Sequence, residues 1–151
     1  MSELLEIENV TVRYQLRPRW RAAIEKRESF LQAVCGVSFS VKAGESFALV
    51  GESGSGKSTL ARAIMGIEAV HSGSICFEGH QLVGLSKANY KSFRRDMSMM
   101  FQDPAGSLSP RLTVKGLITE PFLIHRIGGA TIEKEAIRLL RMVGLGEEFL
   151  H

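Results

Sequence analysis

The sequence lacks the long hydrophobic runs, the secretory leader and the charge excess that assign a chain to a membrane or to nucleic acid. No apolar stretch approaches the roughly 18 residues of a transmembrane helix. The first six residues lack the positive region and apolar core of a secretory signal. A formal charge of +3 is too mild an excess to indicate nucleic-acid binding. We therefore expect a cytosolic chain with no nucleic-acid partner, and any membrane role must come through another subunit.

Cysteine is also scarce. Cys35 and Cys76 have no metal-type spacing and lie in apolar, strand-like runs, which predicts two buried free thiols rather than a metal site or a disulfide. Internal repeats and low-complexity tracts are absent. At 151 residues and 44% hydrophobic content, the chain is long enough for one domain with a real core.

The informative stretch is a glycine-rich loop at residues 51–58. Its letters, GESGSGKS, match the phosphate-binding pattern G-x-x-x-x-G-K-S/T at every fixed position. An apolar, strand-like run at 46–50 precedes it and a helix-compatible run at 59–65 follows it. The alternative is a flexible Gly/Ser linker that matches by chance. The flanking elements and the Lys-Ser pair favour a P-loop that binds nucleotide.

Each residue type in this loop has a physical role. Glycines allow backbone N–H groups to converge on phosphate oxygens, and the helix that follows directs its positive dipole end at the same charge. Lys57 is expected to contact the outer phosphates, Ser58 to bind Mg²⁺ and Thr59 to contact an inner phosphate. The predicted nucleotide contacts are Gly51, Ser53, Gly54, Ser55, Gly56, Lys57, Ser58 and Thr59.

Hydrophobic periodicity predicts an α/β chain. Strands are expected at 5–14, 34–41, 46–50, 74–78 and 97–101, and helices at 59–65, 86–95, 114–124 and 131–143. The stretch 34–41 alternates as in an antiparallel sheet, whereas 46–50 is a short apolar run typical of parallel sheets. The polar, basic segment 15–29 is expected to be a solvated loop or short helix, with contact to lipid headgroups or a partner as the alternative.

The segment after the last predicted strand gives a family resemblance. Gln102-Asp103-Pro104, followed by Ser-Leu-Ser-Pro-Arg at 107–111, resembles the Q-loop of ABC transporter ATPases, in the branch that powers oligopeptide, dipeptide and nickel importers. The resemblance covers nearly all of the chain. It implies a P-loop NTPase fold of the ABC ATPase type, represented by its N-terminal portion. That portion comprises an antiparallel β subdomain, the P-loop strand and helix, the Q-loop strand and the start of the helical subdomain.

The resemblance also implies roles for particular residues. Tyr14 would stack on the adenine of ATP, the alternative being a core tyrosine. Gln102, with Lys57, would serve catalysis by reaching Mg²⁺ and the attacking water, the alternative being a polar strand end. Residues 105–114 would dock transmembrane permease subunits, the alternative being an ordinary loop. A second ATP-binding subunit, identical or different, and a peripheral place on the cytoplasmic face of the cell membrane are further implications.

Two features depart from the family pattern. Cys35 stands where this branch usually carries aspartate. The Leu-Ser-Gly-Gly-Gln signature, the strand ending in Asp-Glu and the switch histidine do not occur in the 151 residues. We therefore expect a partial domain, with a nucleotide-binding core at 1–104 and the start of a helical subdomain at 105–151. It would bind Mg-ATP at most, without turnover. In the sheet of this family, two strands that come later in the sequence lie between the strands expected at 46–50 and 97–101. Those two strands are not in the 151 residues, so the apolar side chains of 46–50 and 97–101 are expected to be exposed.

Other classes remain open on the residues alone. A nucleotide-binding or partner-docking module that does not hydrolyse ATP would also need the loop at 51–58. A GTPase should carry an Asn/Thr-Lys-x-Asp motif, which the sequence lacks. A small-molecule kinase is harder to exclude by motif, but it would not need the Gln-Asp-Pro segment at 102–104.

Overall fold

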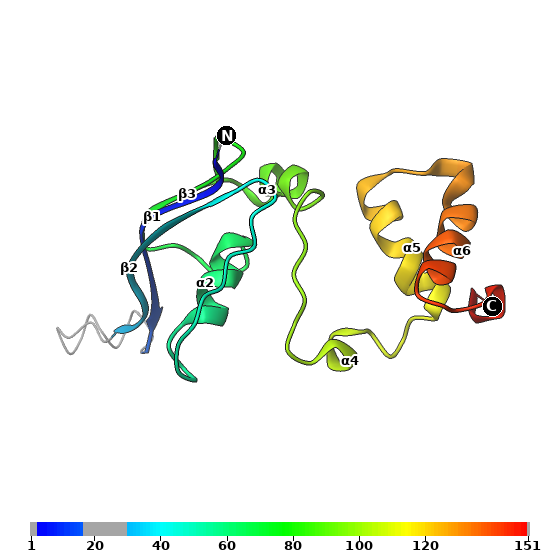
Figure 1. Cartoon of the computed structure of the whole chain (residues 1–151), viewed down its shortest axis with the longest axis horizontal. Coiled ribbons are helices and arrows are strands. Elements are labelled where there is room, and N and C mark those ends of the chain that lie inside the picture. The colour runs from blue at the N-terminus through cyan, green and yellow to red at the C-terminus, as the bar shows by residue number, and fades with distance from the viewer. Residues whose placement is uncertain (1–2, 17–29, 151) are drawn as a thin grey trace. The chain divides into compact units, whose positions relative to one another are not determined.

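The structure is a computed structural model that describes residues 3–16 and 30–150. It divides into two compact units, one ending at Met97 and the other beginning at Ser98 (Figure 1). The sequence-based division after residue 104 stays a prediction. Most of the basic segment 15–29 lies outside the described residues. Among the helices that the structure describes, none combines the length and the apolar character that a membrane crossing requires.

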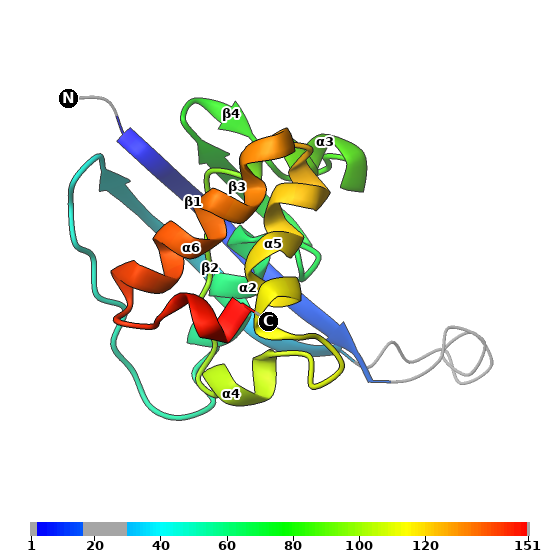
Figure 2. The same ribbon diagram turned by 90° about the vertical axis from the view of Figure 1, so that its right-hand side faces the viewer.

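The first unit is built on an antiparallel sheet of four strands in the order β2-β1-β3-β4. The strands are β1 (Glu3–Gln15), β2 (Phe30–Lys42), β3 (Ser72–Phe77) and β4 (His80–Gln81). Ile7 of β1 lies opposite Phe39 of β2 and Ile75 of β3. Figures 1 and 2 show β1 between β2 and β3. The small antiparallel layer expected from the sequence is confirmed.

A bulge interrupts β1. Its register shifts on both sides of Val10, and Asn9 adopts a φ of 48°. Val10, Thr11 and Val12 are consequently all buried, although strict alternation along the strand would leave Thr11 on the outer side. The Thr11 hydroxyl is satisfied because it accepts a hydrogen bond from the N–H of Gly36 at 3.1 Å. A bulge of this kind changes which side of the sheet the side chains face, and the alternating pattern of the sequence does not reveal it.

Helix α2 (Lys57–Ile64) packs on this sheet. It buries Leu60 and Ala63 in the same core cluster as residues of β1, β2 and β3. Gly66, with a φ of 61°, ends the helix, and its N–H donates to the carbonyl of Ala63 at 3.0 Å. The helix predicted at 59–65 is confirmed. Its N-terminal end lies at the glycine-rich loop.

The segment after α2 returns to the sheet and then forms a short helix. Strand β3 begins at Ser72, two residues before the predicted start of the strand at 74. Gly73 lies in the strand, where a Cβ would come within 2.5 Å of the carbonyl oxygens of Glu8 and Asn9. Helix α3 (Lys87–Phe93) confirms the helix predicted at 86–95, and Ser86 caps it, since its hydroxyl accepts from the N–H of Asn89 at 3.2 Å.

Two predicted strands do not form. Residues 46–50 and 97–101 carry no regular secondary structure, and within the described part of the chain neither segment pairs with a strand. Most of their apolar side chains are exposed as expected, with Val50 at 89% and Met100 at 88%, whereas Met97 and Met99 are half-buried. An apolar run shows that a segment suits burial, whereas a strand also needs a neighbour that accepts its hydrogen bonds. Both predictions of strand structure are therefore wrong here.

The second unit is helical. It contains α4 (Pro104–Ser107), α5 (Val114–His125), η1 (Gly129–Thr131), α6 (Ile132–Met142) and η2 (Glu147–Leu150). Ala136, Leu140 and Leu150 form its buried core, with Ile118 packed against them. Both long helices were predicted within two residues of these bounds. Val143, directly after α6, is 71% exposed.

The two cysteines are free, but they are not both buried. Cys76 of β3 is partly buried, whereas Cys35 of β2 is exposed. The prediction of a buried thiol is therefore wrong for Cys35. In β2, Val34 is buried but the next residue, Cys35, is exposed, so an apolar run does not bury each of its members.

Candidate functional site

The glycine-rich loop connects the extended residues 46–50 to α2 through two left-handed glycines. Gly54 has a φ of 81°, and Gly56, the N-cap of α2, has a φ of 91°. Side chains rarely adopt this region. Gly51 has no such φ, and its requirement is space, because a Cβ there would lie 2.9 Å from the Ser55 hydroxyl oxygen. The glycines are thus needed for two different physical reasons.

The end of the loop rests on the sheet. A Cβ on Gly56 would lie 2.2 Å from the carbonyl oxygen of Ala33 in β2, so the two backbones meet with no side chain between them. Sequence reasoning did not single out Ala33, because nothing in the motif specifies which strand the loop contacts. This contact fixes where α2 begins relative to β2.

Lys57 folds back over the loop. Its ammonium donates to the carbonyl oxygen of Gly51 at 2.7 Å, to that of Glu52 at 2.6 Å and to the Ser55 hydroxyl at 3.1 Å. An ammonium has three N–H donors, and all three are used. The positive charge is therefore held over the concave side of the loop, within reach of an anion that exchanges for these contacts.

The first turn of α2 adds a second source of positive potential. Its N–H groups at Lys57, Ser58 and Thr59 precede the first i→i−4 bond, which Leu60 makes to Gly56 at 2.8 Å. The first turn carries no acidic residue, and no side chain caps it. Unpaired N–H groups at a helix start bind phosphate. The chemistry of the loop therefore fits a polyphosphate.

The start of α2 also suits a magnesium ion that is bound together with phosphate groups. The Ser58 side chain is exposed at the second position of α2. Among the residues described, no group of three or more His, Cys, Asp or Glu is arranged to hold a metal. Magnesium commonly takes few protein ligands and completes its shell with phosphate oxygens and water. A single hydroxyl suits that arrangement.

A cavity of about 370 Å³ adjoins the loop. One wall comes from β2 and the other from the loop and α2. Its lining residues are Gln32, Ala33, Val34, Cys35, Val37, Leu49, Val50, Gly51, Ser55, Gly56, Lys57 and Leu60. Apart from Gln32, the lining is apolar at the sheet, and Ser55 and Lys57 make it polar at the loop, which is the usual pattern of a small-molecule site.

Tyr14 lies near the loop end of the sheet but not in this cavity. It is half-buried at the end of β1, opposite Leu31 of β2. Within the described part of the chain, the cavity lining does not include it. The stacking role of Tyr14 on adenine stays a prediction.

Gln102 lies in the second unit, where it is exposed at a bend just before α4. Its neighbour Asp103 has a clear structural role, since the carboxylate accepts from the N–H of Gly106 at 2.9 Å and so caps α4. The predicted docking stretch 105–114 contains two exposed leucines, Leu108 at 56% and Leu112 at 41%. The roles of Gln102 and of this stretch stay predictions.

Two side chains that sequence reasoning missed contact the other end of α2. The Tyr90 hydroxyl donates to the carbonyl oxygen of Ile64 at 2.6 Å, and the Arg94 guanidinium donates to that of Gly66 at 3.1 Å. Burial raises the pKa of Tyr90, partly offset by the positive charge of Arg94. Tyr90 therefore stays a hydrogen-bond donor at neutral pH. A spacing of four residues places Tyr90 and Arg94 on one helix face, but this spacing alone does not single them out in the sequence.

Comparison with known proteins agrees with this geometry. Residues 34–150 match the family described as ABC transporter. A probable peptide ABC transporter ATP-binding protein of Sinorhizobium fredii is 42% identical over 96% of this chain and 40% of its own length. An oligopeptide transport ATP-binding protein of Haemophilus influenzae is 38% identical over 94% of this chain and 43% of its own length. The chain thus spans less than half of these relatives.

A solved structure agrees as well. An ATP-binding cassette, described as a dimer in a post-hydrolysis state bound to ADP and Pi, superposes with a TM-score of 0.77 at 27% identity. The match covers 97% of this chain and 60% of that one. The expected fold class, the N-terminal portion of a P-loop ATPase with an antiparallel β subdomain, is confirmed.

Proposed function

Because this chain belongs to the ABC transporter family, we propose that it is the N-terminal part of an ATP-binding subunit that energises import of peptides or similar small solutes. The observation that carries the proposal is the loop at 51–58. There the Lys57 ammonium, two left-handed glycines and an uncapped helix start converge on one concave surface. Arrangements of this kind bind the phosphates of a nucleotide.

The residues divide the work of binding. Backbone N–H groups of the loop and the first turn of α2 hold the phosphates, with Ser53, Gly54, Ser55 and Gly56 forming the loop surface. Lys57 exchanges its contacts to the loop for the outer phosphates, and Ser58 gives its hydroxyl to Mg²⁺. Thr59 contacts an inner phosphate, and Tyr14 stacks on adenine through its ring face.

Full-length members of this family hydrolyse ATP. For this chain alone we propose binding of ATP without its hydrolysis. Hydrolysis requires a water held in line with the γ-phosphate, and Gln102 is the residue proposed to help place it and Mg²⁺. The Asp-Glu pair expected to hold the metal and activate water does not occur in the 151 residues. We expect negligible ATP turnover from this chain alone. A rate within about tenfold of a complete relative's would overturn that expectation.

The proposed partners follow from the family. Transmembrane permease subunits would dock at residues 105–114, and a second ATP-binding subunit, identical or different, would complete the site. The exposed Leu108 and Leu112 supply apolar surface for the first contact. The assembly would place the chain on the cytoplasmic face of the cell membrane, as a peripheral subunit.

Binding of a fluorescent ATP analogue with Mg²⁺ to the purified chain tests the central proposal. We expect saturable binding that Lys57→Ala abolishes, because the variant loses the ammonium over the loop. Lys91→Ala is the matched control, since Lys91 is an exposed lysine of α3 and its loss changes the net charge equally. Equal binding by the two variants would contradict the assignment of the loop.

A further inference from the structure

The end of α2 that faces away from the P-loop is tied to α3. The last carbonyls of a helix lack partners within it. Here the carbonyls of Ala61, Arg62 and Ala63 accept from the backbone beyond the helix. The next carbonyl, that of Ile64, accepts from the Tyr90 hydroxyl at 2.6 Å. Side chains of α3 therefore continue the capping where the backbone stops.

Arg94 completes this cap. Its Nε donates to the carbonyl oxygen of Met65 at 3.4 Å and its Nη2 to that of Gly66 at 3.1 Å. A guanidinium at this position also interacts favourably with the negative end of the helix dipole. Tyr90 and Arg94 thus hold three successive carbonyls, and we call the pair the α2 clamp.

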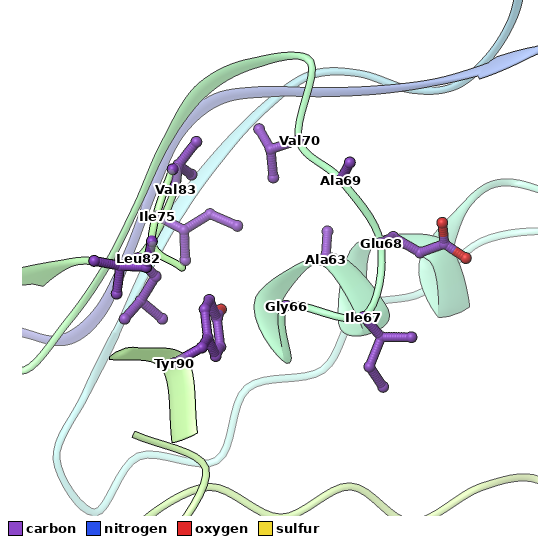
Figure 3. A pocket seen from close by; sticks show the side chains of 12 residues that line it. Ala63, Gly66, Ile67, Glu68, Ala69, Val70, Ile75, Leu82, Val83 and Tyr90 are labelled. Atoms are coloured by element: carbon purple, nitrogen blue, oxygen red, sulfur yellow. The ribbon is translucent and has the colours of Figure 1, made fainter. Parts of the chain in front are cut away.

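The clamp is packed as well as hydrogen-bonded. Tyr90 is only 7% exposed, and its ring lies so close to Gly66 that a Cβ there would come within 2.5 Å of it. The Arg94 guanidinium lies 5.5 Å from the centre of the same ring. Figure 3 shows Tyr90 extending from α3 toward the end of α2 at Gly66. The contact allows little sliding of α2 along its axis.

Both ends of α2 are consequently fixed to different neighbours. The helix has eight residues and is about 12 Å long. Gly56 rests on Ala33 of β2 at one end, and the clamp holds the other. A helix this short moves as one body, so a shift at Ile64 is passed to Lys57 and to the N–H groups of the first turn.

We propose that Tyr90 and Arg94 are positioning residues for the P-loop. By fixing the C-terminal end of α2, they set where the Lys57 ammonium and the first-turn N–H groups lie, and so tune affinity for a polyphosphate. The expected consequence for nucleotide rests on the proposed function. The positioning of the loop itself does not, and it is measurable in the chain without nucleotide.

Amide hydrogen exchange tests the positioning directly. The reporters are Leu60, whose N–H donates to Gly56 at 2.8 Å, and Ser55, whose N–H donates to Glu52 at 3.2 Å. We expect Arg94→Gln to raise exchange at both by about threefold to tenfold. Arg95→Gln is the matched control, with the same charge change at the adjacent exposed arginine. If amide exchange becomes faster only at residues 63–67 and in α3, or becomes faster throughout β1 as well, Arg94 merely stabilises the fold. Either result overturns the proposal.

Affinity provides the second measurement. With the fluorescent ATP analogue and with inorganic tripolyphosphate, we expect Arg94→Gln to weaken binding about threefold to tenfold. Arg94→Lys should recover part of it, and Arg95→Gln should match the wild type. Unchanged affinity in Arg94→Gln, with wild-type binding intact, overturns the tuning of affinity. If the wild type binds neither ligand, the proposed function fails, and the exchange data alone decide whether the clamp positions the loop.

Discussion

Gly56 and Ala33 meet backbone to backbone, since a Cβ on Gly56 would lie 2.2 Å from the Ala33 carbonyl oxygen. This contact joins the P-loop to β2 at the point where α2 begins. Because the obstacle is backbone, a side chain at residue 56 cannot be accommodated by a rotamer change. The glycine is therefore required by packing as well as by its φ of 91°.

The first prediction compares alanine at two glycines of the loop. Gly54→Ala meets open space, so it should cost only the left-handed strain of about 1–2 kcal/mol. Gly56→Ala should cost clearly more free energy of unfolding, because the Ala33 carbonyl must also move. Urea unfolding of both variants measures the difference. Equal losses would mean that the contact with Ala33 does not constrain the loop.

Local signals made much of this fold predictable. The P-loop is specified by a short motif, and α3 by a serine that caps it. The helices at 114–125 and 132–142 were predictable because their apolar spacing lies within one segment. For each of these, the interactions that decide the structure lie a few residues apart in the sequence.

The features that were predicted wrongly or missed depend on residues that are distant in the sequence. Residues 46–50 and 97–101 are apolar enough for strands, but pairing depends on a neighbour that their own letters do not specify. The burial of Thr11 follows from a bulge and from its bond to Gly36, 25 residues away. Tyr90 and Arg94 bind backbone carbonyls, which carry no sequence signal, so no motif could have pointed to them.

The second prediction uses Cys35 as a reporter of the cavity beside the P-loop. Cys35 is an exposed residue of the cavity lining, whereas Cys76 is partly buried in β3 and does not line the cavity. A nucleotide in the cavity should therefore slow the reaction of a maleimide with Cys35. Labelling rates are compared with and without Mg-ATP in Cys76→Ser and, as the control, in Cys35→Ser. Unchanged labelling of Cys35 at saturating nucleotide would place the ligand elsewhere.

The third prediction concerns the second unit. The Thr113 hydroxyl accepts from the N–H of Gly116 at 3.2 Å and so caps α5. Thr113→Ala should destabilise the start of α5 by about 1 kcal/mol, because one N–H loses its acceptor. Thr113→Ser keeps the hydroxyl and serves as the control. Exchange of the Leu117 amide, which donates to Thr113 at 2.9 Å, reports the change. Similar exchange in both variants would show that the cap contributes little.

The fourth prediction follows from the buried hydroxyl of Tyr90. Burial raises its pKa, and the nearby Arg94 only partly offsets this, so the folded state keeps the proton to a higher pH than the unfolded state does. The stabilisation is complete below the ordinary tyrosine pKa of about 10 and is lost as pH rises through the raised folded value. Tyr90→Phe lacks this linkage, although it loses about 1 kcal/mol of hydrogen bonding at neutral pH. We therefore expect the free energy of unfolding to fall more between pH 8 and about pH 10.5 in the wild type than in the variant.

Tyr14 is present in both proteins and cancels in the comparison. Parallel pH profiles would mean that the Tyr90 hydroxyl ionises as freely in the folded chain as in water, which its bond to Ile64 argues against.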